Sequence, residues 1–323
     1  MEQPKTESEE AAGTVCPSCG EVAEIDAKFC EACGQDLNVE PLPACVACGE
    51  LAVGKEGYCE FCGHKQPAER DHKKFEKGSV FAGTDRGKRH RNNEDAVAIG
   101  EIDGAAILVV CDGVSSTAGS AEASLAAVRQ ARDVLVQRVD GSSSEDAVAA
   151  ALGNAAEAAQ REAAGAEVPT GEPASPHADD GPPSSTFVAV VAQILEDGVR
   201  LSTAWLGDSR AYWLGAEPTQ LSIDHEVQGS LTRWIGADSE DSVPEISQTL
   251  VGNDGMLVVC SDGLWRYADD ASAMKATVDS LVSEGNGGLA LVSALIDFAN
   301  DGGGHDNISV ALWSPPSNIT EEE

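Results

Sequence analysis

The chain has 323 residues, enough for one large folded domain and a small accessory domain. Its formal net charge of -34 repels phosphate backbones and anionic lipid, which argues against nucleic acid and membrane partners. It has no apolar run of about 18 residues, so no membrane span is predicted. The acidic start, M-E-Q-P-K-T-E-S-E-E, lacks the basic and apolar regions of a signal peptide. The composition therefore predicts a soluble cytoplasmic protein.

Eight of the ten cysteines form four C-x-x-C pairs near the N-terminus. The second two pairs repeat the first two at a constant offset, with Cys45 lying 29 positions after Cys16, which marks an internal duplication. Each pair leads into a glycine, where the backbone can turn tightly. Two such pairs brought together give the tetrahedral thiolate arrangement of structural zinc. The predicted ligands of two Zn²⁺ ions are Cys16, Cys19, Cys30 and Cys33, and Cys45, Cys48, Cys59 and Cys62.

A segment this short cannot bury enough apolar surface to fold unaided, so metal binding is expected to supply its folding free energy. The alternatives are a disulfide framework, which needs an oxidising compartment, and a redox C-x-x-C, which would not come in duplicated quartets. Zinc ribbons sometimes bind nucleic acid, but acidic residues outnumber Lys28, the one lysine of the first copy. A protein-docking or structural role is therefore favoured over nucleic acid binding.

Composition divides the chain into five parts. An acidic, disordered N-terminus is expected at 1–13, the double zinc ribbon at 14–66 and a charged linker at 67–77. A large domain follows at 78–314, and an acidic tail at 315–323.

The first half of the large domain alternates apolar runs with turn signals. Strands are predicted at 79–84, near 96–99 and at 105–111. The alanine- and leucine-rich stretches at 118–139 and 145–164 have helical spacing and few helix-breaking residues, so two long helices are predicted there.

The second half begins with a loop, predicted over 165–184 from its five prolines. Two strands joined by a turn at Asp197-Gly198 follow, and 222–252 is predicted to be irregular. Helices are predicted at 271–283 and 289–300, before a final strand in N-I-S-V-A-L-W. Many strands with helices in pairs favour an α+β sandwich over an alternating parallel sheet.

Four aspartates lie just after an apolar run or in a glycine-containing turn. They are Asp112 in V-V-C-D-G, Asp208 in W-L-G-D-S-R, Asp262 in V-V-C-S-D-G and Asp306 in G-G-G-H-D-N-I-S-V. A buried strand that stops at a carboxylate aims it out of the end of the sheet, where ligands commonly bind. Oxygen ligands of this kind suit a hard cation. The alternative is four unrelated turn aspartates, because Asp-Gly is a common turn dipeptide.

Eight motifs occur in order over residues 78–314: N-N-E-D-A, V-V-C-D-G, S-S-T, L-G-D-S-R-A-Y, L-S-I-D-H, L-T-R-W-I-G, C-S-D-G-L and G-H-D-N-I-S. In this order the region resembles the metal-dependent Ser/Thr protein phosphatases of the type 2C family. The resemblance implies an α+β fold, an antiparallel β-sandwich flanked by helices in four α-β-β-α layers, here with a small N-terminal tandem zinc-ribbon domain. It also implies an active site at one edge of the sandwich.

The resemblance also implies roles for individual residues. Asp112 would bridge two Mn²⁺ or Mg²⁺ ions with the Gly113 carbonyl as a further ligand, Asp262 and Asp306 would complete the second ion's protein ligands, Glu94 and Asp95 would hold metal-bound waters, and Asp208 would help form a third site. Two such ions can share one water and lower its pKa for attack on phosphorus. No phospho-enzyme is expected, and Cys111 and Cys260 are interpreted as buried core thiols.

One departure from the family pattern concerns the substrate phosphate. The family usually places an arginine where this chain has His90, and Arg89 and Arg91 flank it. In an extended strand neighbouring side chains point to opposite faces, so neither arginine replaces the missing one without local distortion. Histidine lacks the planar fork of arginine, which predicts weaker phosphate binding with Arg91 or Arg89 recruited.

The sequence thus predicts a serine/threonine protein phosphatase. Its partners would be phosphorylated proteins, the substrates of a bacterial Ser/Thr protein kinase, and the ribbons would serve as a docking or structural module. The competing hypothesis is a weak or inactive pseudophosphatase that binds partners through the ribbons. The presence of every metal-ligand acid argues against it.

Overall fold

The computed structural model describes residues 14–16, 19–24, 27–34, 37, 42–54, 57–63, 66, 69–114, 119–167 and 181–316. Both acidic ends of the chain lie outside these residues, as does most of the predicted 165–184 loop. Ser115 and Ser116 also lie outside them. The chain divides into two compact units, Met1–Pro67 and Ala68–Glu323, called here the N-terminal and C-terminal units. Among the described residues, no helix has the length and hydropathy needed to span a bilayer.

The N-terminal unit has little regular structure. Strands β1 (Thr14–Val15) and β2 (Val22–Ala23) form one hairpin, and isolated bridges join residues of the second copy. The four glycines after the C-x-x-C pairs have φ between 72° and 77°, and their N–H groups donate to the carbonyl of the residue four before. These tight turns are the ones that the sequence predicts at Gly20, Gly34, Gly49 and Gly63.

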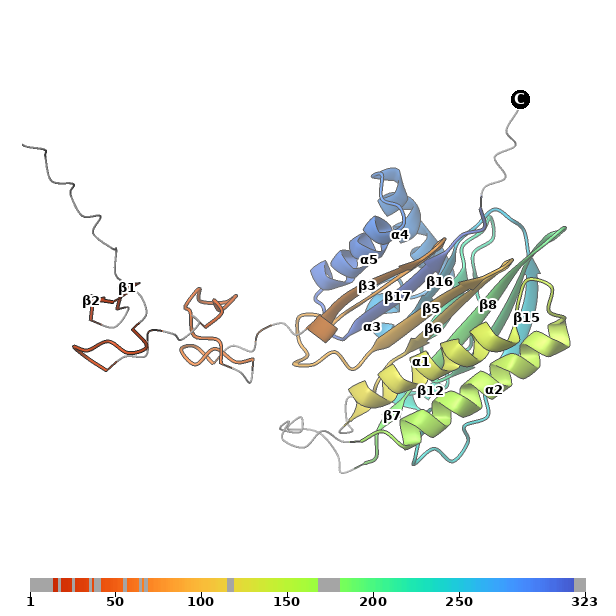
Figure 1. The fold of residues 1–323 in the computed structure, drawn as a ribbon. Helices are drawn as coiled ribbons and strands as arrows, with labels where there is room; N and C mark the ends of the chain where they lie inside the picture. Colours follow the sequence, from red (N-terminus) through yellow and green to blue (C-terminus); the bar gives the residue numbers. More distant parts are fainter. Residues whose placement is uncertain are drawn as a thin grey trace, which may run out of the picture. The chain divides into compact units, whose positions relative to one another are not determined.

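Two antiparallel sheets form the centre of the C-terminal unit (Figure 1). The six-stranded sheet has the order β11 (Thr219–Gln220), β10 (Arg210–Trp213), β16 (Leu257–Cys260), β17 (Ile308–Trp313), β4 (Val80–Asp85) and β3 (His72–Lys77). The five-stranded sheet has the order β15 (Glu245–Val251), β9 (Gly198–Leu206), β8 (Phe187–Leu195), β6 (Ala105–Cys111) and β5 (Ala96–Ile102). Short strand pairs join β7 (Ser184–Ser185) to β14 (Ile235–Gly236) and β12 (Glu226–Val227) to β13 (Ser230–Leu231).

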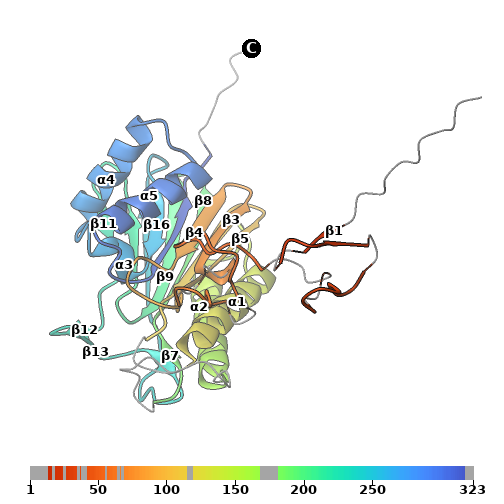
Figure 2. The same ribbon diagram turned by 90° about the vertical axis from the view of Figure 1, so that its left-hand side faces the viewer.

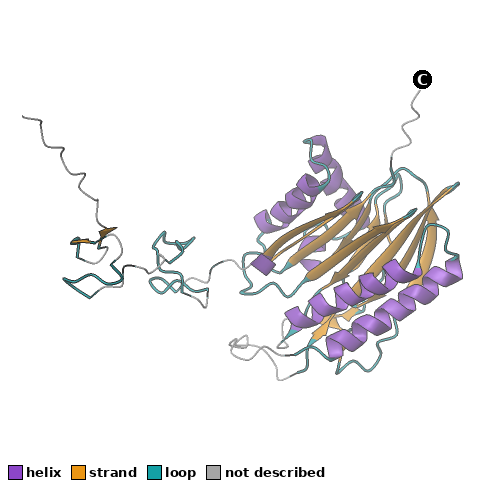
Figure 3. Cartoon of the chain, in the orientation of Figure 1, coloured by secondary structure: helices purple, strands orange, loops and turns teal. Residues whose placement is uncertain are grey.

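Helices cover the outer face of each sheet (Figures 2 and 3). Helices α1 (Ser120–Arg138) and α2 (Glu145–Ala164) pack on the five-stranded sheet, and α3 (Asp262–Trp265), α4 (Ala271–Ser283) and α5 (Leu289–Asp301) lie on the other. The 3₁₀ helix η1 (Glu69–Asp71) precedes β3. Three buried apolar clusters separate the four layers. The predicted four-layer sandwich is confirmed, and the predicted helices match within a few residues.

Strand β6 explains the apolar run that ends at V-V-C-D-G. All seven of its residues are buried, because it is an interior strand between β8 and β5 with a layer packed on each face. Leu108 and Val110 point into the cluster between the sheets, whereas Val109 and Cys111 point into the cluster under α1 and α2. Cys111 is therefore a buried core thiol, as predicted.

Two segments differ from the prediction, and both are edge strands. Residues 72–77, predicted as linker, form β3, which pairs with β4 from His72↔Asp85 to Lys77↔Val80. Within the region predicted to be irregular, β15 pairs with β9 along its whole length. Most side chains of both strands are exposed or half-buried, so neither shows the apolar alternation by which strands are recognised.

Candidate active site

Six acidic residues lie at one edge of the two sheets and are called here the carboxylate site: Glu94, Asp95, Asp112, Asp208, Asp262 and Asp306. Strand register brings them together, because Ala96 pairs with Cys111 in one sheet and Cys260 pairs with Val310 in the other. Asp262 is the first residue of α3 and is separated from the end of β16 only by Ser261. The edge of the sandwich is where the sequence places the site.

The end of β6 is held by the neighbouring strand. The backbone N–H of Asp112 donates to Thr186 Oγ1 at 2.9 Å. The Asp112 carbonyl accepts from the N–H of Thr186 and from the hydroxyl of Ser185, each at 2.8 Å. These bonds fix the backbone at the point where the carboxyl group of Asp112 enters the site.

Ser261, which the sequence analysis missed, connects the two sheets. Its hydroxyl donates to Asp95 Oδ2 at 2.6 Å and accepts from the N–H of Ser309 at 2.9 Å. The signal in the sequence is the serine inserted between the strand and the acid in V-V-C-S-D-G. Ser261 thereby orients the Asp95 carboxylate toward Asp112 and Asp262.

Asn307 is a second residue that the sequence analysis missed. Its Oδ1 accepts from the N–H of Glu94 at 2.7 Å, and its Nδ2 donates to the carbonyls of Arg86 and Asn92 at 2.8 and 3.0 Å. One side chain thus ties the segment around Asp306 to the loop that carries Glu94. This loop, residues 86–95, is called here the carboxylate loop.

Burial and mutual repulsion perturb the carboxylates. Burial raises the pKa of Asp95 to about 8 and that of Asp208 to about 7, and nearby acidic side chains add to both shifts. Burial also raises the pKa of Asp112 and Asp262, with Asp306 as a repelling neighbour of each. The Asp112 carboxyl is close enough to Asp95 and Asp262 to affect the pKa of both.

The donor set fits a hard divalent cation. Among the described residues, Asp95 Oδ1 and Asp262 Oδ1 are buried carboxylate oxygens that accept no hydrogen bond. A buried carboxylate oxygen without a donor costs free energy that a cation would recover. Carboxylate and carbonyl oxygens are the ligands that Mg²⁺ and Mn²⁺ prefer, with water filling the remaining positions.

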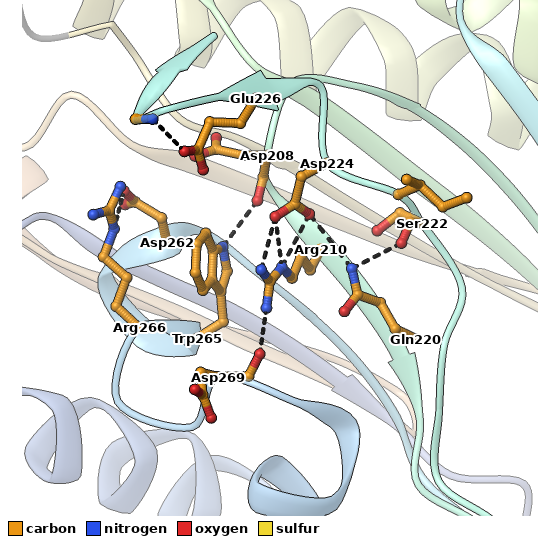
Figure 4. A network of polar contacts seen from close by, with 12 residues as sticks. Asp208, Arg210, Gln220, Ser222, Asp224, Glu226, Asp262, Trp265, Arg266 and Asp269 are labelled. Atoms are coloured by element: carbon orange, nitrogen blue, oxygen red, sulfur yellow. Dashed lines mark hydrogen bonds and ion pairs between the residues drawn. The ribbon is translucent and has the colours of Figure 1, made fainter.

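A stacked arginine fixes the position of Asp208 (Figure 4). The Arg210 guanidinium lies 3.6 Å from the ring centroid of Trp265, whose indole N–H donates to the Asp208 carbonyl at 2.9 Å. Arg210 also forms a two-pronged ion pair with Asp224, through Nε at 3.0 Å and Nη2 at 2.7 Å. The turn between β9 and β10 is therefore locked to α3.

The three phosphate-binding candidates lie in the carboxylate loop, not in a strand. The prediction that Arg89 and Arg91 point away from His90 assumed extended backbone and is wrong in that assumption, because the segment turns between β4 and β5. His90 Nε2 lies 3.2 Å from Asp306 Oδ1, whereas Arg89 and Arg91 are exposed. Of the three, His90 is the one whose side chain has a described contact with an acid of the carboxylate site.

Arg266 is a further cation at this site. Its Nε donates to Asp262 Oδ2 at 2.7 Å, while 55% of its side chain stays exposed (Figure 4). The sequence analysis missed it, although it lies one helical turn after Asp262. His305 directly precedes Asp306 in the chain, and its ring stacks on Tyr267.

The N-terminal cysteines form two compact sets. In each set the four sulfurs lie within 4.8 Å of one another, and all eight cysteines are free of disulfides. The Cys16–Cys33 and Cys45–Cys62 sulfur pairs are 3.6 and 3.7 Å apart. Tetrahedral zinc with Zn–S bonds of about 2.3 Å requires sulfurs about 3.8 Å apart, so both sets fit structural zinc.

Comparison with known proteins identifies a family for each part of the chain. The protein phosphatase 2C family matches residues 82–291, and the double zinc ribbon family matches residues 16–63. No curated protein matches the chain.

Solved structures of serine/threonine phosphatases resemble the C-terminal unit. That of S. agalactiae is 22% identical with a TM-score of 0.57, over 73% of this chain and 98% of that one. That of Mycobacterium tuberculosis, PstP/Ppp, is 21% identical with a TM-score of 0.51, over 73% and 97%. The PstP catalytic domain with two manganese ions is 23% identical with a TM-score of 0.51, over 72% and 96%. At these identities the likeness shows the fold, and together with the family match it shows that the chain belongs to the protein phosphatase 2C family of serine/threonine phosphatases, with an N-terminal double zinc ribbon.

Proposed function

We propose that the carboxylate site hydrolyses phosphoserine and phosphothreonine in proteins with the help of two bound Mn²⁺ or Mg²⁺ ions. The observation that carries the proposal is the convergence of Asp95, Asp112 and Asp262, whose carboxyls repel one another. One buried oxygen each of Asp95 and Asp262 accepts no hydrogen bond. When bound, the paired ions would supply an activated water for in-line attack on phosphorus.

The proposed roles of the chain's own residues follow from their places at the site. The ligands would be Asp112, the Gly113 carbonyl, Asp262 and Asp306, with Glu94 and Asp95 holding the ions' waters and Asp208 contributing to a third ion. Thr186 and Ser261 would keep Asp112 and Asp95 in position through the bonds described above. Such preorganisation removes the need to reorient the carboxylates at each turnover.

The substrate phosphate needs cationic or hydrogen-bonding partners. His90 borders Asp306 and would bind the phosphate oxygens as a single-point donor. Arg266 is half-exposed beside Asp262 and would add a planar guanidinium. Arg89 and Arg91, exposed on the carboxylate loop, are the other two candidates for this role.

The likeness to manganese-containing PstP supports the choice of cation, and the substrates would be phosphoproteins produced by a Ser/Thr kinase. The zinc ribbons would serve as a docking or structural module. A scaffold with weak or absent turnover is the second candidate, and it is favoured by the histidine at position 90.

The test is Mn²⁺-dependent release of phosphate from a phosphothreonine peptide and from p-nitrophenyl phosphate. Asp112→Asn and Asp262→Asn should each abolish turnover. Asp133→Asn is the matched control, because Asp133 is a half-exposed acid on α1 that pairs with Arg132. Mn²⁺ bound to the wild-type chain without turnover would instead support the scaffold.

A further inference from the structure

We propose that Arg70 and Asp71, where the chain enters the C-terminal unit, are positioning residues for the carboxylate loop. Both belong to η1, in the segment that the sequence predicts as linker. The family match begins at residue 82, so both lie outside it. The inference rests on the proposed function of the carboxylate site and assigns a role to residues outside the matched range.

Arg70 forms two hydrogen bonds with the carboxylate loop. Its Nη2 donates to the carbonyl of Asn93 at 3.4 Å, and its own carbonyl accepts from Asn93 Nδ2 at 3.4 Å. Its Nη1 lies 3.1 Å from Glu122 Oε1, in the first turn of α1. A single arginine thus spans the loop and the helix beside it.

Asn93 transmits the position of Arg70 to the acids. The Asn93 side chain is buried, its Nδ2 also donates to Thr84 Oγ1 at 2.8 Å, and its Oδ1 accepts from the N–H of Asp95 at 3.2 Å. Asn93 directly precedes Glu94 in the chain. A shift of Asn93 must therefore move the backbone of both acids that follow it.

The contact with Glu122 links Arg70 to the part of the site around Asp112, at the end of β6. The carbonyl of Glu94 accepts from the N–H of Gly113 at 3.1 Å and from the hydroxyl of Ser124 in α1. Gly113 follows Asp112, so the start of α1 and the end of β6 meet at Glu94. By joining Glu122 to Asn93, Arg70 sets the spacing between the loop that carries Glu94 and Asp95 and the first turn of α1, the helix that follows Asp112 in the chain.

Asp71 holds the other end of the same loop. Its carbonyl accepts from the N–H of Arg86 at 2.8 Å, and its carboxylate lies 3.7 Å from Arg86 Nη1. Asp71 is 1% exposed. The Arg86 carbonyl in turn accepts from Asn307, next to Asp306. Arg70 and Asp71 together therefore hold both ends of residues 86–93 in place.

The solvent exposure of the Arg70–Glu122 ion pair distinguishes a positioning role from a merely stabilising one. The side chains of Arg70 and Glu122 are 40% and 32% exposed, so solvent screens their ion pair and its removal should change global stability little. Misplacement of a site by about 1 Å can nevertheless cost about a hundredfold in rate. Loss of Arg70 should therefore appear in metal affinity and kcat before it appears in Tm.

The experiment compares Arg70→Ala with wild type in the full, zinc-loaded chain. Mn²⁺ binding is followed by electron paramagnetic resonance of the free ion. The kinetic constants kcat and KM are measured with p-nitrophenyl phosphate, and unfolding is followed by tryptophan fluorescence. We expect half-saturating Mn²⁺ to rise about fivefold and kcat to fall, with KM and Tm nearly unchanged. Arg132→Ala, which removes a similarly exposed ion pair on α1, should leave all four quantities at the wild-type values.

Two further variants sharpen the test. Arg70→Lys keeps a charge near Glu122 but cannot also reach the Asn93 carbonyl, so its Mn²⁺ affinity should be intermediate. Adding Glu122→Gln to Arg70→Ala should cost little more than Arg70→Ala alone, because both act through one contact. A wild-type Mn²⁺ isotherm and kcat in Arg70→Ala, or losses that only track Tm, would overturn the proposal. Absence of turnover in wild type would refute the proposed function, while the binding isotherms would still decide the role of Arg70.

Discussion

The buried carboxylates of this site are stable only when something neutralises them. Asp95, Asp208 and Asp262 are each 6–7% exposed, and each repels or is repelled by a neighbouring acid. Charges withdrawn from water without partners are strongly destabilising. Protons or divalent cations must therefore compete for the same oxygens.

This competition predicts the pH dependence of the metal-free protein. In EDTA, the free energy of unfolding of the C-terminal unit should fall as the pH rises from about 5.5 to about 8.5. The folded pKa of Asp95, about 8, exceeds its ordinary value of 3.8, so the folded state keeps a proton that the unfolded state has lost. This stabilisation is complete below the unfolded pKa and disappears as the pH passes through the folded one; Asp208, with a pKa of about 7, adds to it.

Denaturant titrations followed by tryptophan fluorescence would measure this slope, because all five tryptophans lie in the C-terminal unit. Saturating Mn²⁺ should reverse the slope, since cations displace the protons. Asp95→Asn should weaken the slope in EDTA, whereas the half-exposed Asp133→Asn should not. A stability that increases with pH in EDTA would contradict the argument.

A second prediction at this scale concerns residue 90. His90→Arg should lower KM for p-nitrophenyl phosphate and raise kcat/KM about tenfold, because a guanidinium binds phosphate through two parallel hydrogen bonds. Arg132→Ala is the control, because Arg132 is a partly exposed arginine on α1 that pairs with Asp133. An unchanged KM in His90→Arg, together with severe loss in His90→Ala and none in Arg91→Ala, would assign phosphate binding to His90 itself.

At the scale of the elements, the site depends on the close approach of α3 to the segment before β17. A Cβ atom at Gly263 would overlap the Asn307 carbonyl oxygen, which is backbone and cannot turn away. Asp262 precedes this glycine at the start of the helix. Separating the two segments would therefore move Asp262 away from Asp112.

Gly263→Ala should accordingly destabilise the C-terminal unit by about 1–3 kcal/mol and weaken Mn²⁺ binding. Gly153→Ala is the matched control. Gly153 lies inside α2 with nothing within 4 Å of an added Cβ, so alanine should stabilise the unit by about 0.5–1 kcal/mol. Denaturant titrations of both variants measure the two free energies. Unchanged stability in Gly263→Ala would show that α3 can shift without cost.

At the scale of the molecule, the two units depend on different sources of stability. The C-terminal unit has three buried apolar clusters, whereas the described cluster of the N-terminal unit consists of Cys45, Val53 and Cys59 with Ala52 packed against it. We therefore expect zinc to supply the folding free energy of the N-terminal unit.

Cys19→Ser should reduce the zinc content by one ion per chain while leaving tryptophan emission and the unfolding midpoint unchanged. The second copy should keep its metal, because its four sulfurs form a separate set. Elemental analysis and fluorescence measure these quantities. Cys111→Ser is the control for zinc content, because it changes a cysteine outside both sets and should leave both ions bound. Loss of both zinc ions in Cys19→Ser would show that the copies are coupled.

Local sequence pattern was sufficient to predict the central strands and helices. Strand β6, helices α1, α2, α4 and α5 and the C-x-x-C turns all follow from periodicity or from spacing along the chain. Asp112, Asp208, Asp262 and Asp306 were found for the same reason, whereas Glu94 and Asp95 were identified through the family resemblance. Their grouping at one edge agrees with the order of motifs, and their individual roles stay predictions.

The tertiary structure alone decided what holds these acids in place. Edge strands β3 and β15 have no apolar alternation, and only their pairing with β4 and β9 makes them strands. Asn307 binds the N–H of Glu94 across 213 positions, and Arg70 reaches Glu122 across 52. Sequence by itself determined which residues can form strands, helices and ligands, since those preferences are local. Which polar side chains support the ligands depended on packing between distant segments, which no local pattern records.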